Sequence, residues 1–176
     1  KNHSDFVIRQ LNYYSSSLDF PFTIYLGDSS DGIHRDRILA RVDELKGQLK
    51  VVYHWVDPTV VAHAVPKQLV DIVEEKYVAF LGDDDLFVPE GLKDCIEFLE
   101  SNPHYSAAQG QAVLFELDRE GAYGEIEILG RYFIKECELE TPAERLNAFL
   151  DDYWVLDFSV HRTDDYRATC DCRDME

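Results

Sequence analysis

Three consecutive aspartates, Asp83, Asp84 and Asp85, directly follow an apolar run and a glycine near the middle of the chain. Their carboxylates repel one another, and partial burial makes the charged forms costlier still. A divalent cation relieves this repulsion, and oxygen ligands favour hard ions such as Mg²⁺ or Mn²⁺. Because neighbouring side chains diverge, we expect only one or two of these carboxylates to bind the ion. Sites of that kind are usually completed by water and substrate phosphates, so the motif predicts a metal–diphosphate site.

A structural alternative exists for the same three aspartates. They could form a polar turn in which Asp85 or a neighbour stabilises the positive N-terminus of a helix that begins near Pro89. A second acidic stretch, Asp28-Ser29-Ser30-Asp31, follows another apolar run. The carboxylate of Asp28 could accept hydrogen bonds from a nucleobase or a ribose. It could equally form an Asx turn as the chain leaves the strand.

Hydrophobic periodicity places both acidic stretches at the ends of strands. We predict helices with the apolar faces Val7-Ile8-Leu11-Tyr14 (with Ser4 as N-cap), Ile38-Val42-Leu45 (ending at Gly47) and Val65-Leu69-Ile72-Val73, a helix from Pro89 to about Ser101, and one that begins at Thr141 with a capping box. We predict strands at Phe22–Gly27, Leu49–Trp55, Tyr77–Leu81, Tyr105–Leu117, Glu125–Glu136 and Trp154–His161.

The alternation of helices and strands in the front half predicts an α/β fold with an open, mostly parallel sheet flanked by helices. The back half is richer in strands, so we expect the sheet to be mixed. The 176 residues fit one domain, 1–176, with a Rossmann-like nucleotide-binding half at about 1–110 and a second half at 111–176. In such sheets ligands bind at the carboxyl ends of the strands, where both acidic stretches are expected.

Charge excludes some classes of partner. The chain has 35 acidic and 17 basic residues, a formal net charge of −18, which disfavours binding to nucleic acid or to an anionic membrane surface. No apolar run approaches the roughly 20 residues of a transmembrane helix. Walker A and G-x-G-x-x-G motifs are absent, which excludes the P-loop and Rossmann dinucleotide classes at the motif level.

The spacing of the cysteines does not indicate a metal site or a disulfide scaffold. Cys95 occupies an apolar helix position and is expected in the core. Cys170 and Cys172 lie in a charged tail, where they could bind a metal only with further ligands. We interpret the set as that of a reducing compartment rather than a disulfide scaffold.

The two acidic stretches together resemble the inverting GT-A glycosyltransferases of family 2. The resemblance spans roughly Lys1 to Gly110. Its motifs are Tyr25–Gly32 and, about 55 residues later, Tyr77–Leu92, in which the aspartates are followed by Leu86-Phe87, Pro89, Glu90 and Leu92. It implies transfer of a sugar from a UDP- or GDP-sugar to a hydroxyl of an acceptor glycan or small molecule, with Mn²⁺ or Mg²⁺ as cofactor. It also implies a cytoplasmic location, with the full protein peripheral at the inner membrane face.

The resemblance assigns roles position by position. Asp28, with Ser29, would contact the nucleobase, Asp83 the ribose, Asp84 the metal, and Asp85 would be a second metal ligand. Lys67 would face the nucleotide, and the alternative for it is a solvated helix position. His161 and Arg162 would lie on the acceptor side, and the alternative for them is an ordinary edge strand.

Two family features are missing from the pattern. The family's first strand, which touches the nucleotide, is not found, and the chain is expected to lack it together with a C-terminal part. The catalytic base normally lies beyond the His-Arg segment, and Asp157, Asp164 and Asp165 are the nearest candidates. Alternative functions are therefore a sugar nucleotidyltransferase, a nucleotide-binding domain that is catalytically incomplete, and an interaction module.

Overall fold

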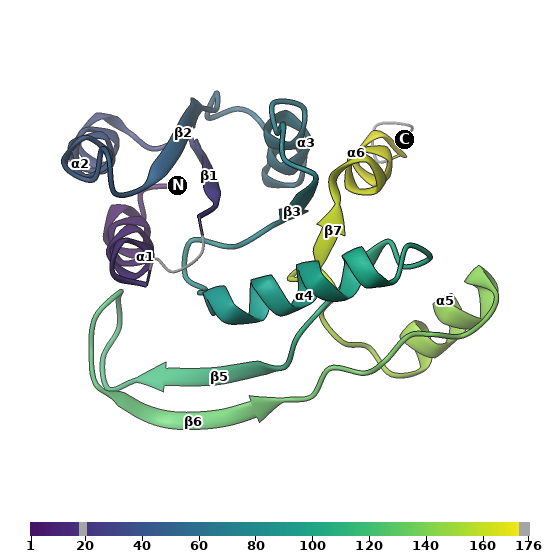
Figure 1. Cartoon of the computed structure of the whole chain (residues 1–176). Coiled ribbons are helices and arrows are strands. Elements are labelled where there is room, and N and C mark those ends of the chain that lie inside the picture. Colours follow the sequence, from purple (N-terminus) through teal and green to yellow (C-terminus); the bar gives the residue numbers. More distant parts are fainter. Residues whose placement is uncertain (18–20, 173–176) are drawn as a thin grey trace.

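The computed structural model describes residues 1–17 and 21–172 as a mixed α/β structure (Figure 1). The helices are α1 (Ser4–Ser16), α2 (Gly32–Glu44), the short 3₁₀ helix η1 (Ala62–Ala64), α3 (Val65–Val70), α4 (Pro89–Ser101), α5 (Pro142–Asp151) and α6 (Thr163–Cys172). The strands are β1 (Thr23–Asp28), β2 (Lys50–Trp55), β3 (Tyr77–Ala79), β4 (Ala107–Ala108), β5 (Ala112–Leu117), β6 (Ile126–Tyr132) and β7 (Val160–Arg162). The α/β class predicted from the sequence is confirmed.

The described strands form three separate hydrogen-bonded groups. β1 and β2 are parallel and paired from Thr23–Lys50 to Asp28–Trp55. β7 lies between β3 and β4 and runs antiparallel to both, and β5 and β6 form an antiparallel hairpin. Parallel pairing is therefore seen between β1 and β2. The described pairs do not join into one open sheet, so the GT-A type of sheet stays a prediction.

The main apolar core lies between α1, α2 and the β1–β2 pair. The buried members of this cluster are Val7, Leu11, Tyr14, Ile38, Leu45 and Leu49. α1 and α2 lie on one side of β1 and β2, and α3 lies on the other (Figure 1). On the α3 side the packing is close at Gly27, where an added Cβ would lie 3.1 Å from Val65 and 3.2 Å from Leu69. Of the predicted apolar face of the first helix, Val7, Leu11 and Tyr14 are confirmed as core residues, whereas Ile8 is only half-buried.

Glu75 connects β1 to the chain that enters β3. Its carboxylate accepts hydrogen bonds from the hydroxyls of Thr23 and Tyr25, both on β1. Burial tends to raise the pKa of Glu75, but the hydrogen bonds from Thr23 and Tyr25 outweigh it and lower the pKa to about 2. The ionised carboxylate is therefore the form that holds the two segments together.

Several predicted boundaries need correction. Ser4 is the first residue of α1 rather than its N-cap; its buried hydroxyl accepts a hydrogen bond from Arg37 and lies 2.9 Å from Nδ1 of His34. The predicted strand at Trp154–His161 is reduced to β7, because Trp154 is buried beside Phe149 and the chain turns before Val160.

The strand predicted at Tyr105–Leu117 divides into β4 and β5, which pair with different partners. The segment called a charged tail forms α6, and β7 is a central strand of its group rather than an edge strand. Two local predictions are confirmed: Thr141 and Glu144 form the capping box of α5, and Gly47 has a φ of 85° just after α2.

Two isoleucines on α2 test the core. Ile38 is fully buried and Ile33 is 73% exposed, so Ile38→Ala should destabilise the fold by about 2–5 kcal/mol because it opens a cavity. Ile33→Ala should change stability by no more than about 0.5 kcal/mol. Urea unfolding of both variants measures the difference, and equal effects would contradict the placement of α2.

The low pKa of Glu75 predicts a component of stability that depends on pH. Since the folded-state pKa lies below the ordinary value of 4.5, the stabilisation is present above that value and is lost as pH falls toward about 2. Glu75→Gln should therefore show a shallower loss of unfolding free energy between pH 4.5 and 2 than the unaltered protein. Glu74→Gln, which removes the same charge at an exposed neighbour, is the matched control.

Candidate functional site

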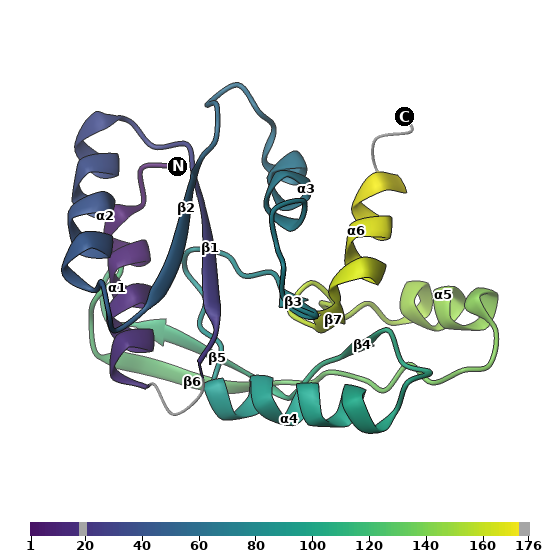
Figure 2. The same ribbon diagram turned by 45° about the horizontal axis from the view of Figure 1, so that its top comes forward.

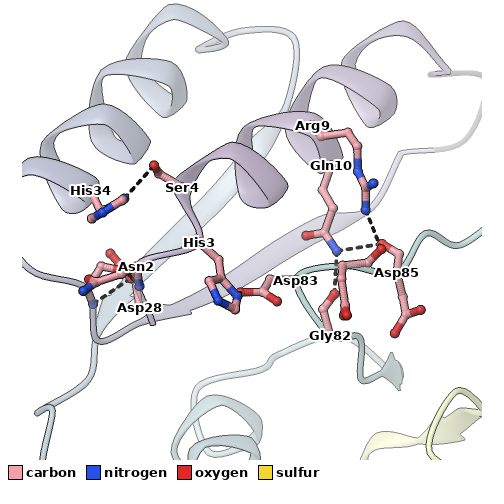
Figure 3. A network of polar contacts seen from close by, with 12 residues as sticks. Asn2, His3, Ser4, Arg9, Gln10, Asp28, His34, Gly82, Asp83 and Asp85 are labelled. Carbon is pink, nitrogen blue, oxygen red and sulfur yellow. Dashed lines mark hydrogen bonds and ion pairs between the residues drawn. The ribbon is translucent and has the colours of Figure 1, made fainter. Parts of the chain in front are cut away.

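The acidic loop, Gly82–Asp85, is held by two side chains of α1. Gln10 donates hydrogen bonds from its amide nitrogen to the main-chain oxygens of Gly82 and Asp85, the latter at 2.8 Å. Arg9 donates to the main-chain oxygen of Asp84 (Figure 3). Because these donors bind main-chain oxygens, they fix the loop without occupying the carboxylates of Asp84 and Asp85.

The side chains of Asp84 and Asp85 both turn back over Gly82. A Cβ added to Gly82 would lie 3.0 Å from an oxygen of Asp84 and 3.2 Å from an oxygen of Asp85. Both side chains therefore have a carboxylate oxygen close to Gly82, and the expected divergence of neighbouring side chains stays a prediction. Burial raises the pKa of Asp85, the charges of Asp84 and Asp83 add to the rise, and the charge of Arg9 opposes it. The two carboxylates thus form the kind of electrostatically costly pair that a cation would relieve.

Asp83 contacts the start of α1. One of its carboxylate oxygens lies 2.9 Å from Nδ1 of His3 (Figure 3), and its side chain is about one-third exposed. The structure therefore gives Asp83 a partner that differs from those of Asp84 and Asp85. The expected ribose contact of Asp83 stays a prediction.

Asp28 is only 6% exposed, and both of its carboxylate oxygens accept hydrogen bonds. One accepts from the main-chain N–H of Ser30 and the other from the hydroxyl of Tyr53, each at 2.9 Å. Burial and the hydrogen bond to Asp28 raise the pKa of Tyr53 to about 12. The bond to Ser30 is the Asx turn that the structural alternative predicted. Any contact between Asp28 and a nucleobase would have to use the remaining lone pairs.

Asn2 joins the loop after β1 to the start of α1. Its side chain donates to the carboxylate of Asp31 at 2.8 Å and accepts from the N–H of Asp31, while its own N–H donates to Ser30. The next residue, His3, contacts Asp83. Two successive residues therefore bring the Asp28 turn and the acidic loop to the same edge of the molecule. No motif marked Asn2, His3, Arg9 or Gln10, because none lies in an apolar face or an acidic stretch.

Lys67 lies on α3 and pairs with two carboxylates. Its ammonium group is 2.6 Å from Asp171 on α6 and 3.1 Å from Asp71, and both partners raise the pKa of Lys67. The described polar contacts of Lys67 thus connect α3 to α6. The expected contact with a nucleotide remains a prediction and would require this pairing to open.

Arg162, expected on the acceptor side, forms hydrogen bonds within the fold. Its guanidinium donates to the main-chain oxygens of Tyr105 and Leu99 and to the hydroxyl of Tyr77. These bonds connect β7 to β3 and to the end of α4. A fourth, longer bond reaches the main-chain oxygen of Asn102 at 3.4 Å. The side chain therefore anchors this part of the fold, and an acceptor contact would have to compete with four hydrogen bonds.

His161 is adjacent on β7 and lies half-buried beside Tyr166, with ring centroids 5.0 Å apart. Burial lowers the pKa of His161, although the charges of Asp157 and Asp165 act in the opposite direction. The imidazole is therefore held mainly in its neutral form at neutral pH. The structure leaves its predicted acceptor-side role untested.

The three candidates for a catalytic base are all exposed. Asp164 and Asp165 lie in the first turn of α6, where their negative charges interact favourably with the positive end of the helix dipole. Asp164 also forms an ion pair with Arg167 at 2.9 Å. No polar contact described in residues 1–17 and 21–172 connects Asp157, Asp164 or Asp165 to the acidic loop. The segment that follows the acidic loop approaches the segment next to Asp157 through the rings of Phe87 and Phe158, whose centroids are 6.5 Å apart.

The metal-binding capacity of the described residues is limited to small sets. Within these residues no cluster of three or more His, Cys, Asp or Glu side chains could hold an ion. The pair of Asp84 and Asp85 fits an ion that takes one or two carboxylates and completes its shell with water and phosphate oxygens. Cys95 is half-buried and Cys170 is buried in α6, whereas the side chain of Cys172 lies outside the described residues.

No helix in the described part of the chain is both long and apolar enough to cross a bilayer. A scan against protein-family models finds no match for this chain. A search of the curated proteins finds no match either. The chain's own residues are therefore the basis for assigning a function.

The contacts of Gln10 predict how firmly the acidic loop is held. Gln10→Ala removes two hydrogen bonds to the loop, so amide hydrogen exchange in a peptide covering residues 82–86 should become about tenfold faster. Gln48→Ala removes the same group at an exposed position after α2 and should leave that peptide unchanged. Exchange measured by mass spectrometry compares the two, and an unaltered rate in Gln10→Ala would show that the loop does not depend on α1.

Proposed function

We propose that the chain binds a nucleoside-diphosphate sugar at the edge formed by the Asp28 turn and the acidic loop, and transfers the sugar to an acceptor hydroxyl. The observation that supports this most is the convergence of Asp84 and Asp85 over Gly82, on a loop joined to the Asp28 turn through Asn2 and His3. The arrangement offers carboxylates for a metal at one end and hydrogen-bonding groups for a nucleoside at the other. The resemblance to GT-A glycosyltransferases of family 2 predicts the same division.

Asp84 and Asp85 are the residues that would hold Mn²⁺ or Mg²⁺. When bound, the ion would act as a Lewis acid that neutralises charge on the departing diphosphate. A cation also overcomes a general obstacle, since a chain with a net charge of −18 repels an anionic donor. Arg9 and Gln10 would keep the two carboxylates in place through their hydrogen bonds to the main chain of the loop.

The nucleoside would lie between the Asp28 turn and Asp83. Asp83 has its oxygens within reach of the α1 start, and a ribose hydroxyl could donate to the oxygen that His3 does not contact. Ser29 is half-exposed next to the buried Asp28 and Ser30, so its hydroxyl is the more accessible group of that turn. We therefore expect Ser29 to contribute more to nucleoside binding than Asp28 does.

The base that would deprotonate the acceptor is left unassigned. General-base catalysis requires a group within hydrogen-bond reach of the acceptor hydroxyl, and it contributes about 10²–10⁴-fold to the rate. Asp157, Asp164 and Asp165 lie on the acceptor-side half but have no described contact with the acidic loop. This observation favours a second candidate function, a nucleotide-binding domain that does not itself catalyse transfer.

Calorimetry with UDP and with GDP, each with and without Mn²⁺, tests the binding site. We expect binding that requires Mn²⁺ and that weakens at least about tenfold in Asp84→Asn, because the variant loses a charged ligand. Asp94→Asn makes the same substitution on the exposed face of α4 and should bind as the unaltered chain does. Binding that ignores Mn²⁺, or that both variants weaken equally, would refute the metal–diphosphate site.

Donor turnover separates the two candidate functions. NMR monitors the release of UDP or GDP from a panel of nucleotide sugars. Comparing the release with and without simple sugar acceptors reports transfer directly. A chain that binds nucleotide with Mn²⁺ but releases none above the rate in buffer would be a binding domain. Release that disappears in Asp84→Asn and persists in Asp94→Asn would establish transfer at the proposed site.

A further inference from the structure

The hairpin of β5 and β6 presents a large apolar face that stays exposed among the described residues. Val113 pairs with Arg131 and Phe115 pairs with Leu129, so these four side chains lie on the same face. Phe133 extends that face, since the guanidinium of Arg131 lies 5.1 Å from the centre of its ring. Val113, Leu129 and Phe133 are 59%, 69% and 70% exposed. We call this set the open face of the hairpin.

The hairpin is attached to the rest of the molecule at its two ends. At the turn, Ala122 is buried and its main-chain oxygen accepts a hydrogen bond from Arg9 of α1. At the other end, the hydroxyl of Tyr132 accepts one from the N–H of Val155. Between these attachments the hairpin runs from the region of α1 toward α5 (Figures 1 and 2), and it lies below α4 in the view of Figure 1. An isolated two-stranded ribbon is marginal in water, so this span is the kind that gains from a third strand or a helix.

A hollow lies in the open face. Its volume is about 360 Å³, and it is lined by Gln111, Ala112, Val113, Leu129, Gly130 and Arg131. Val113, Leu129 and Arg131 of this lining belong to the open face, whereas Gly130 pairs with Leu114, so any side chain there would lie on the opposite face. The volume is at the small end of the range for binding pockets and suits one or two large apolar side chains.

The charges around the hairpin indicate the chemistry of the partner. Residues 111–140 contain eight acidic and three basic side chains. Arg119 pairs with Asp118 and Lys135 pairs with Asp152, so two of the three basic groups are already neutralised. A second copy of this chain would bring another net charge of −18 against the same surface. Charge complementarity therefore favours a basic partner over self-association.

We propose that the open face of the hairpin binds an extended polypeptide segment in which apolar residues alternate with Lys or Arg. The segment adds a third strand at an edge of the hairpin, with its apolar side chains on the side of the open face and its basic side chains on the opposite side, where Glu116 lies. The segment would contact neither the acidic loop nor a nucleotide, so this proposal does not rest on the proposed transfer reaction.

Two synthetic ten-residue peptides test the proposal, one alternating Leu with Lys and the other alternating Leu with Glu. Fluorescence anisotropy should show binding of the Leu–Lys peptide and none of the Leu–Glu peptide. Leu129→Ser should weaken that binding about tenfold, because it removes an apolar wall of the hollow. Ile33→Ser, at an equally exposed site on α2, should leave it unchanged.

Attraction by net charge alone is the main rival explanation of peptide binding. It predicts the same affinity for the unaltered chain, Leu129→Ser and Ile33→Ser, and that result would overturn the proposal. Self-association of the chain in sedimentation, abolished by Leu129→Ser, would also overturn it in favour of a second copy. Thermal unfolding followed by circular dichroism confirms that each variant is folded, and Phe133→Ser provides a second disruption of the open face.

Discussion

The joining of two strand groups that share no described backbone hydrogen bond is the constraint on which this structure depends. β1 pairs only with β2, and β3 pairs only with β7, among the described residues. Side chains must therefore hold the groups together. Glu75 does so by accepting from Thr23 and Tyr25, and α1 does so by reaching from the β1–β2 core to the acidic loop. The candidate site includes the acidic loop that α1 contacts, so its geometry is set by side chains rather than by a continuous sheet.

The way in which α1 holds the acidic loop also explains how three adjacent carboxylates can be accommodated. Neutralising each of them with its own ion pair would stabilise the loop but would remove the charge that a metal needs. Arg9 and Gln10 instead bind the main-chain oxygens, and Asp85 keeps a raised pKa. Part of the repulsion therefore persists in the folded chain. A bound cation would relieve it, which is the physical reason to prefer the metal site over a purely structural turn.

Local features of the sequence predicted local features of the fold. The spacing of Val7, Leu11 and Tyr14 identified the buried face of α1, and Thr141 with Glu144 identified the start of α5, because each signal lies within one or two helical turns. Pairing between distant segments left no such signal. β7 runs antiparallel between β3 and β4, and Arg162 within it bonds partners that are 57 to 85 residues away in sequence. The acidic motif was visible, but its supports, Asn2, His3, Arg9 and Gln10, carry no motif.

Arg9 connects the candidate site to the hairpin. One nitrogen of its guanidinium donates to the main-chain oxygen of Ala122 in the hairpin turn, and another donates to the main-chain oxygen of Asp84. Because the guanidinium is planar and rigid, the two acceptors must keep a fixed separation for both bonds to be made. A partner that orders the hairpin would therefore also restrict the main chain that carries Asp84. Arg9 thus joins the acidic candidate site to the turn of the apolar hairpin.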